Sequence, residues 1–280
     1  MKLLRYGPRD QEKPGCMDDT GRIRDLSAHI EDVDGRSLGD ESLARLRALD
    51  LSQLPEVADD VRIGACVGSV SKVICAGLNY SDHAHETGKA APEEPILFGK
   101  ATTALCGPGD RVELPRNGLK CDWEVELGVV IGTRAKYVTE DRALDHVAGY
   151  CLFNDVSERA FQSERGGQWI KGKSHDTFGP CGPWLLTRDE IPDPQRIALW
   201  LEVDGQRRQD GSTATMIFPV RHLVHYISQF MTLEPGDIIA TGTPAGCGLG
   251  QRPQVWLRAG NVMTLGGTGL GEQRLEVVQA

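Results

Sequence analysis

The stretch Cys121-Asp122-Trp123-Glu124-Val125-Glu126-Leu127-Gly128-Val129-Val130-Ile131 places two carboxylates two residues apart at the start of an apolar, β-branched run. Residues two apart in a strand share a face, so we predict a strand over residues 123–131 with both glutamates side by side. Inward-facing carboxylates repel one another and are costly to desolvate unless a cation lies between them. The stretch therefore predicts either a hard metal ion at this strand or a polar face turned to solvent.

A third carboxylate, Asp155, follows the next buried apolar run, residues 147–153. An acid at a strand end is often only a turn former. Together with Glu124 and Glu126, however, it could complete a three-carboxylate face, and oxygen-only ligation favours Mg²⁺, Mn²⁺ or Ca²⁺ over zinc. Asp122 shares the predicted strand face and could replace one of the three, so spacing alone leaves the ligand set open.

The bulk composition is that of a globular protein of one or two domains: 280 residues, 40% hydrophobic and 25% charged. A net charge of −9 without a basic cluster argues against nucleic acid or an anionic membrane as a partner. The eight cysteines are scattered without paired spacing, which is typical of reduced thiols. With an N-terminus that lacks a signal-peptide pattern, these features predict a cytoplasmic protein.

The pattern of apolar residues predicts a β-rich α+β fold, because strands outnumber helices and do not alternate with them. We predict a small N-terminal module over residues 1–70, with a helix near 41–49, and a larger second domain over residues 71–280. In that domain we predict strands and helices as follows: strands 72–76, 112–115, 123–131, 147–153, 184–187, 197–204, 238–241, 255–258 and 274–278, and helices from 81 or 82, over 139–146, 157–165 and 219–231.

One motif points to a different class of protein. Residues 167–174, Gly-Gln-Trp-Ile-Lys-Gly-Lys-Ser, match the phosphate-loop pattern of nucleotide triphosphatases. That loop needs an apolar strand before it and a helix after it, whose amides face the phosphates. Here a polar segment precedes the motif, and two prolines and two glycines follow it within ten residues, so we reject nucleotide binding.

Five segments, in order, resemble the fumarylacetoacetate hydrolase family over roughly residues 70–280: residues 77–83, 122–127, 154–159, 173–183 and 234–246. The resemblance implies a mixed β-roll catalytic domain, a homodimer, and a divalent metal such as Mg²⁺, Mn²⁺ or Ca²⁺. The residues that match the family's metal ligands are Glu124, Glu126 and Asp155.

The same resemblance implies further site residues. His83 and Glu86 match a pair that activates water when a lid helix closes, and their i, i+3 spacing puts both on one helical face. Lys173 matches a lysine close to the substrate, and Gln162 a glutamine that assists an enolate. Three more positions are expected to contact substrate: Arg159, Thr243 and Tyr80. Without the resemblance, each of these is more simply a surface, turn or core residue.

The implied reaction is hydrolysis of a C–C bond in an acylpyruvate or 2,4-diketo acid, such as a diketo-deoxy sugar acid, with release of pyruvate. Alternatives on the same site are a ureidoglycolate lyase and an oxaloacetate-decarboxylase, hydratase or isomerase activity, because one fold and ligand set supports several reactions. A metal-binding protein without turnover is a third possibility.

Two positions depart from the family pattern. His175 stands where family members commonly carry Phe, which predicts a more polar pocket. The glycine-rich residues 265–271 leave the strand pairing of the C-terminal segment open.

Overall fold

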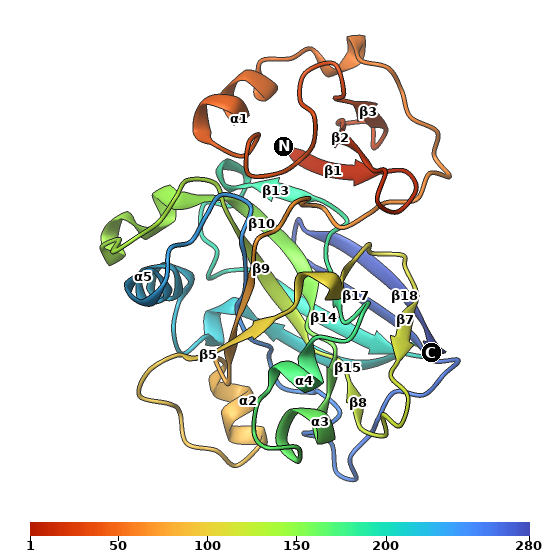
Figure 1. Ribbon diagram of the computed structural model, residues 1–280, viewed down its shortest axis with the longest axis vertical. Coiled ribbons are helices and arrows are strands. Elements are labelled where there is room, and N and C mark those ends of the chain that lie inside the picture. Colours follow the sequence, from red (N-terminus) through yellow and green to blue (C-terminus); the bar gives the residue numbers. More distant parts are fainter.

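The computed structural model describes all 280 residues. Its largest sheet has nine strands and runs through the whole molecule (Figure 1). Its strands lie in the order β3 (Ile23–Asp25), β2 (Lys13–Met17), β1 (Lys2–Tyr6), β13 (Leu185–Thr187), β10 (Val147–Asn154), β9 (Val125–Ile131), β16 (Ile238–Ala240), β4 (Val73–Gly77) and β5 (Ile96–Lys100). A five-stranded sheet packs against it, in the order β15 (Gln206–Ser212), β14 (Ala198–Val203), β17 (Val262–Gly267), β18 (Gly271–Gln279) and β7 (Val112–Leu114). Two short pairs complete the strands: β11 (Ser157–Glu158) with β8 (Cys121–Asp122), and β12 (Gly179–Pro180) with β6 (Leu105–Cys106).

The helices are short and lie around the sheets. The α-helices are α1 (Asp40–Arg47), α2 (Ser81–Glu86), α3 (Arg159–Ser163), α4 (Ile170–Lys173) and α5 (Val220–Phe230). Single 3₁₀ turns or runs occur at η1 (Leu51–Gln53), η2 (Thr102–Ala104), η3 (Glu140–His146), η4 (Arg188–Glu190) and η5 (Thr213–Thr215). The longest α-helix, α5, has eleven residues, and no helix is long and apolar enough to cross a bilayer.

The central strands β9 and β10 are buried along their whole length because both faces are covered. Val129 packs into the apolar cluster shared with the five-stranded sheet and α5, whereas its neighbour Val130 packs into the cluster shared with the N-terminal module. A strand buried on both faces needs a continuous apolar run rather than alternation. The uninterrupted sequence after Glu126 therefore specifies the centre of the fold.

The N-terminal module continues the large sheet. Its first strand, β1, pairs antiparallel with β13 through Lys2 opposite Leu186 and Leu3 opposite Leu185. Figure 1 shows this module at one end of the molecule and α2, α3 and α4 gathered at the opposite end. The domain boundary at residue 70 stays a prediction.

Most predicted elements are present, with four corrections. Residues 255–258 form no strand: Val255 N and Leu257 N donate to Gly248 O and Cys121 O, which are single contacts and not a ladder. The predicted helix 139–146 is a 3₁₀ helix, and the predicted helix 157–165 begins only after β11. The predicted strand 123–131 begins at Val125, because Glu124 N instead donates to the side chain of Asn154.

The glycine-rich segment finds its pairing in the β17–β18 hairpin. A Cβ at Gly266 would lie 2.7 Å from the Trp200 ring, and one at Gly271 would lie 2.7 Å from Pro183. Gly271 also has a positive φ of 79°. These glycines allow the close approach of neighbouring side chains and the tight turn of the hairpin.

Candidate active site

The three predicted ligand carboxylates meet where β9 begins and β10 ends. The two strands are antiparallel, with Glu126 opposite Phe153 and Val125 opposite Asn154, so Asp155 emerges beside Glu124. The amide of Asp155 donates to Glu124 O at 2.9 Å. One carboxylate oxygen from each of Glu124, Glu126 and Asp155 lies within 4.8 Å of the others, and all three side chains are buried.

The structure separates Asp122 from this group. Its Oδ1 accepts hydrogen bonds from the amides of Trp123 and Gly248, at 2.9 and 2.6 Å, and its Oδ2 accepts from the amide of Leu249 and from Arg159 Nε. Asp122 therefore fixes the loop after β16 to the active site. It does not join the three converging carboxylates.

Two buried cations cross-link the acids. Lys173 Nζ donates to Glu124 Oε2 at 2.5 Å and to Asp155 Oδ2 at 2.7 Å. Arg159 Nη2 donates to Glu124 Oε1 at 2.7 Å, while its Nε donates to Asp122. Burial favours the neutral carboxyl of Glu124, but Arg159 and Lys173 outweigh it and lower the pKa of Glu124. Burial likewise opposes the charge of Lys173, but Asp155 and Glu124 raise the pKa of its ammonium group.

Glu126 is the one carboxylate of the three that contacts no cation. It forms no ion pair, and its Oε2 accepts only the amide of Gly242, at 2.8 Å. Burial, followed by the charges of Asp155 and Glu124, raises the pKa of Glu126 well above its usual range. Glu124 and Glu126 thus have opposite pKa shifts although they are two residues apart.

Lys100, at the end of β5, is a buried cation that the sequence analysis missed. Its Nζ lies 2.7 Å from Asp155 Oδ1, but its protons are directed at the carbonyls of Val156, Lys173 and Phe178. Asp155 Oδ1 is consequently buried without a hydrogen bond. An apolar strand that ends in lysine was the available signal, but it does not say which way the ammonium group points.

The predicted water-activating pair forms on α2. His83 Nδ1 lies 3.3 Å from Glu86 Oε2, and the Glu86 carboxylate also accepts the amide of Gly246 at 3.0 and 3.2 Å. Burial raises the pKa of Glu86, but its contacts with His83 and Gly246 outweigh burial and lower it. Glu86 is therefore held as an anion beside His83 and connects α2 to the loop after β16.

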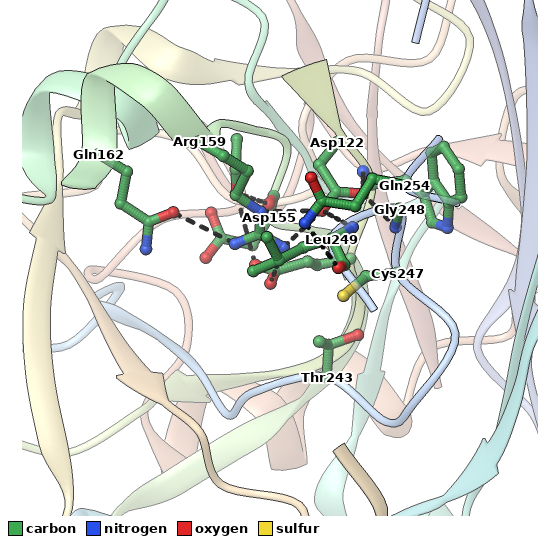
Figure 2. A network of polar contacts seen from close by, with 12 residues as sticks. Asp122, Asp155, Arg159, Gln162, Thr243, Cys247, Gly248, Leu249 and Gln254 are labelled. Atoms are coloured by element: carbon green, nitrogen blue, oxygen red, sulfur yellow. Dashed lines mark hydrogen bonds and ion pairs between the residues drawn. The ribbon is translucent and has the colours of Figure 1, made fainter. Parts of the chain in front are cut away.

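The predicted site residues other than Glu86 and Tyr80 line one cavity of about 330 Å³. Its buried floor carries the three carboxylates with Lys173, Arg159 and Gln162, and its wall includes His83, Thr243, Phe98 and Trp169. Figure 2 shows Arg159 between Asp122 and Gln162, with Thr243 across an open space from this cluster. Gln162 Oε1 accepts from Arg159 Nη1 at 3.2 Å, which leaves its amide group to face the cavity.

At three positions, the contacts in the structure fit the role expected from the sequence less well. Tyr80 is fully buried with an unpaired hydroxyl and does not line the cavity. The Thr243 hydroxyl donates to Val125 O at 2.8 Å and accepts from Gln209, so it has no proton free for a substrate oxygen. His175 does not make the pocket more polar, as expected, because its ring packs between Phe161 and Phe178 outside the cavity.

The segment that matches the phosphate-loop pattern forms part of the active site. Residues 170–173 form α4, which presents Lys173 to the carboxylates. A Cβ on Gly172 would lie 2.3 Å from Glu158 O and 2.5 Å from Gln162 N, so α4 packs backbone to backbone against β11 and α3. The glycine and lysine of the motif thus hold an ammonium group among acids rather than a phosphate.

Comparison with known proteins identifies the family to which the chain belongs. Residues 72–278 match the family model described as fumarylacetoacetate (FAA) hydrolase C-terminal. The chain belongs to the fumarylacetoacetate hydrolase family. It is an enzyme of this family, with the predicted β-rich α+β fold and a small N-terminal module, in which the structure shows the strands β1–β3.

Three similar proteins show the range of the family. A candidate hydrolase of Burkholderia ambifaria is 62% identical over 274 residues, which are 98% of this chain and 97% of the relative. The maleylpyruvate hydrolase of Sphingobium sp. SYK-6, solved with manganese(II) and pyruvate, is 29% identical with a TM-score of 0.83, covering 100% of both chains. The 2-hydroxyhepta-2,4-diene-1,7-dioate isomerase of Mycobacterium marinum is 32% identical with a TM-score of 0.81, covering 100% of this chain and 98% of that one.

Proposed function

We propose that this enzyme is a divalent-metal-dependent hydrolase that cleaves a C–C bond in an acylpyruvate or 2,4-diketo acid and releases pyruvate. The observation that carries the proposal is one cavity lined by Glu124, Glu126, Asp155, Lys173 and His83, whose Nδ1 contacts Glu86. The Sphingobium relative, solved with manganese(II) and pyruvate, supports both the cofactor class and the product.

The residues fit a divalent ion for three reasons. All donors in the group are carboxylate oxygens, which suit Mg²⁺ or Mn²⁺. Asp155 Oδ1 is buried without a hydrogen bond, and Glu126 has no cationic partner. The carboxylates of the cluster, Asp122, Glu124, Glu126 and Asp155, outnumber its cations, Lys100, Arg159 and Lys173, by four to three. We assign Glu124, Glu126 and Asp155 as the ligands, with Mg²⁺ or Mn²⁺ as the ion and a homodimer as the assembly.

When bound, the ion supplies a Lewis acid for the adjacent oxygens of the keto acid. Lys173 adds a second positive charge at the floor of the cavity, and Gln162 offers its amide protons to the developing enolate oxygen. Both groups are buried and held by other residues, so they require little rearrangement when charge develops. Arg159 positions Glu124 and Gln162 by contacting both.

His83 is the base that this arrangement provides for water. Glu86 holds Nδ1, which leaves Nε2 to take a proton from water as the hydroxide adds to the distal carbonyl carbon. The bond between that carbon and C3 then breaks. Its electron pair forms the enolate of pyruvate, the acyl part leaves as a carboxylic acid, and a proton returned to C3 gives pyruvate.

A second candidate is an isomerase of unsaturated keto acids, which the Mycobacterium marinum relative favours. An isomerase moves a proton between carbons and consumes no water. The lyase and decarboxylase alternatives also need no water. Hydrolysis is favoured because His83 lines the cavity and has Glu86 as its partner.

The test is a panel of substrates with the metal-loaded enzyme. Acetylpyruvate, a diketo-deoxy sugar acid, oxaloacetate, ureidoglycolate and an unsaturated keto diacid are incubated separately, following pyruvate or glyoxylate release and incorporation of ¹⁸O from water. We expect pyruvate from a 2,4-diketo acid with ¹⁸O in the acyl product. Turnover of oxaloacetate, ureidoglycolate or the unsaturated acid alone would overturn the proposal.

A further inference from the structure

Three of the eight cysteines, far apart in the sequence, meet in the core outside the active-site cavity. Cys66 lies near the end of the predicted N-terminal module, Cys151 lies in β10, and Cys181 directly follows β12. Cys181 Sγ is 3.5 Å from the sulfurs of both Cys66 and Cys151, and all three sulfurs lie within 4.8 Å of one another. We refer to these three residues as the thiol cluster. None of them lines the active-site cavity, so the cluster is separate from the three carboxylates.

The thiol cluster is enclosed by apolar side chains. Its three residues are 0% exposed and belong to the apolar cluster that includes Val130 and Phe153. Their sulfurs form hydrogen bonds only with one another. A Cβ at Gly128 would lie 2.7 Å from Cys151 Sγ, so the missing side chain on β9 makes the space for that sulfur. The three sulfurs therefore face one another without a competing protein ligand.

The distances between the sulfurs suit a bound ion. Thiolate sulfur binds Zn²⁺ at about 2.3 Å, so three sulfurs around one such ion lie about 4 Å apart. The two shorter distances in the cluster are 3.5 Å and the third is at most 4.8 Å, which brackets that value. A disulfide needs two sulfurs at about 2.05 Å, so the closest pairs would have to approach by about 1.5 Å. The geometry is therefore closer to that of an ion site than to that of a disulfide.

The donor set indicates which kind of ion fits. Thiolates are soft ligands that select Zn²⁺ or Cu⁺, whereas Mg²⁺ and Mn²⁺ prefer oxygen ligands such as the active-site carboxylates. With three thiolates, Zn²⁺ leaves one net negative charge in the core and Cu⁺ leaves two. Because a buried uncompensated charge is costly, the divalent ion is favoured.

An ion can approach the thiol cluster from the side of Cys66. Ala65 and Val67, the chain neighbours of Cys66, line a second cavity of about 580 Å³ together with Cys106. An ion in this cavity is therefore one residue away from Cys66 along the chain. The amide of Cys66 donates to Cys181 O at 3.3 Å, a long hydrogen bond. We expect the ion to enter by local opening of residues 65–67.

We propose that Cys66, Cys151 and Cys181 form a binding site for a thiophilic divalent cation, Zn²⁺, separate from the active-site metal. The ligands come from the predicted N-terminal module, from β10 and from the residue after β12. A bound ion therefore links the module to the central strand of the large sheet. Its effect is on the stability of the fold, and it takes no part in the bond-breaking step.

The experiment uses Cd²⁺ as a spectroscopic substitute for Zn²⁺, because cadmium thiolates give a charge-transfer absorption that cadmium carboxylates do not give. The reduced protein is kept in excess Mg²⁺ and titrated with Cd²⁺. We expect the absorption to rise until one equivalent per chain is bound. X-ray absorption at one equivalent should then show a shell of sulfur neighbours. In a parallel measurement, Zn²⁺ at about a hundredfold excess over its Kd should raise the Tm by roughly 5 °C.

Single substitutions assign the ligands. Cys66→Ala, Cys151→Ala and Cys181→Ala should each remove the charge-transfer absorption and the rise in Tm with Zn²⁺. Cys75→Ala is the matched control and should keep both, because Cys75 is a buried cysteine of the same apolar cluster that lies outside the three. The X-ray absorption of the wild type identifies the ligand atoms even where a core variant fails to fold.

Cys247→Ala tests the other place where a thiol lies near potential ligands, since Cys247 Sγ is 3.9 Å from His83 Nδ1. Absorption that disappears in this variant, with nitrogen or oxygen in the metal shell of the wild type, overturns the proposal. So does the absence of any thiolate absorption at excess Cd²⁺, or absorption that all three variants of the thiol cluster retain. Binding of Cd²⁺ without a rise in Tm on addition of Zn²⁺ overturns the assignment to zinc.

Discussion

Lys173 and Asp155 form a buried ion pair, with Nζ 2.7 Å from Oδ2, although the lysine lies in a segment that the sequence presents as a phosphate loop. The pair brings α4 onto the end of β10 and places an ammonium group between Asp155 and Glu124. The charge that holds the carboxylates together is therefore the same charge that the proposed reaction uses.

Replacing Lys173 tests both its role in holding the carboxylates together and its role in the proposed reaction. Lys173→Met should lower kcat by at least about 10²-fold, because a preorganised charge at the enolate is lost. In the metal-free protein it should also cost about 3–5 kcal/mol in unfolding free energy, because breaking a buried pair leaves its acids uncompensated. Full activity of the variant would show that the role given to Lys173 is wrong.

A second readout separates charge from packing. Because Lys173→Met removes a cation from the cluster, added Mg²⁺ or Mn²⁺ should raise the Tm of this variant more than that of the wild type. The control is Lys171→Met, which alters an exposed lysine of the same helix and should behave as the wild type. Equal metal-induced shifts in Tm for Lys173→Met and the wild type would argue against charge compensation.

The pKa of Glu126 predicts how metal binding depends on pH. Because burial and the neighbouring acids raise this pKa, Glu126 is protonated in the metal-free protein at pH values where an ordinary glutamate is ionised. A divalent ion binds the carboxylate form, so its affinity should fall as the pH drops through the raised pKa, and binding should release a proton. Calorimetry in two buffers of different ionisation enthalpy measures that proton.

The same shift has a consequence for stability. An acid whose pKa is raised on folding contributes stability below its unfolded pKa and loses that contribution as the pH rises through the folded value. The metal-free protein should therefore lose stability with rising pH in this window, and Glu126→Gln should remove that dependence. A metal affinity independent of pH and no proton release would contradict the assignment.

His83 and Glu86 predict a graded loss of hydrolysis. His83→Ala should reduce kcat by about 10² to 10⁴-fold, the usual contribution of a general base. Glu86→Gln should reduce it less, because the imidazole stays in place and loses only its anionic partner. His85→Ala, an exposed histidine on the same helix, is the matched control and should retain full kcat. Isomerase activity without hydrolysis in the wild type would reassign the base.

Replacing Gly172 with alanine should displace α4, because the structure has no room for the added methyl group. In Gly172→Ala the new Cβ would lie 2.3 Å from Glu158 O, so α4 must move away from β11 and α3. We expect loss of activity with retained far-ultraviolet circular dichroism, because the change is local to Lys173. Gly109→Ala is the control, since nothing lies within 4 Å of its Cβ position. An active Gly172→Ala enzyme would show that α4 tolerates displacement.

The apolar run after Glu126 predicted the centre of the fold because a strand buried on both faces leaves a simple signal in the sequence. The converging carboxylates were also predictable, as spacing placed Glu124 near Glu126 and the family resemblance added Asp155. Spacing could not separate Asp122 from them, because that depends on the break in the strand at Trp123 and Glu124. Lys100 and the short helix α4 were missed because their positions follow from long-range packing rather than local periodicity.

The central claim is that Glu124, Glu126 and Asp155 bind one divalent ion on which activity depends. The direct measurement is the metal content and kcat of the enzyme after dialysis against a strong chelator, followed by addition of Mg²⁺ or Mn²⁺, in the wild type and in Glu126→Gln. We expect the chelated wild type to be inactive and to regain activity with one equivalent of metal per chain, whereas Glu126→Gln binds metal far more weakly. Full activity of the wild type without bound metal would contradict the account.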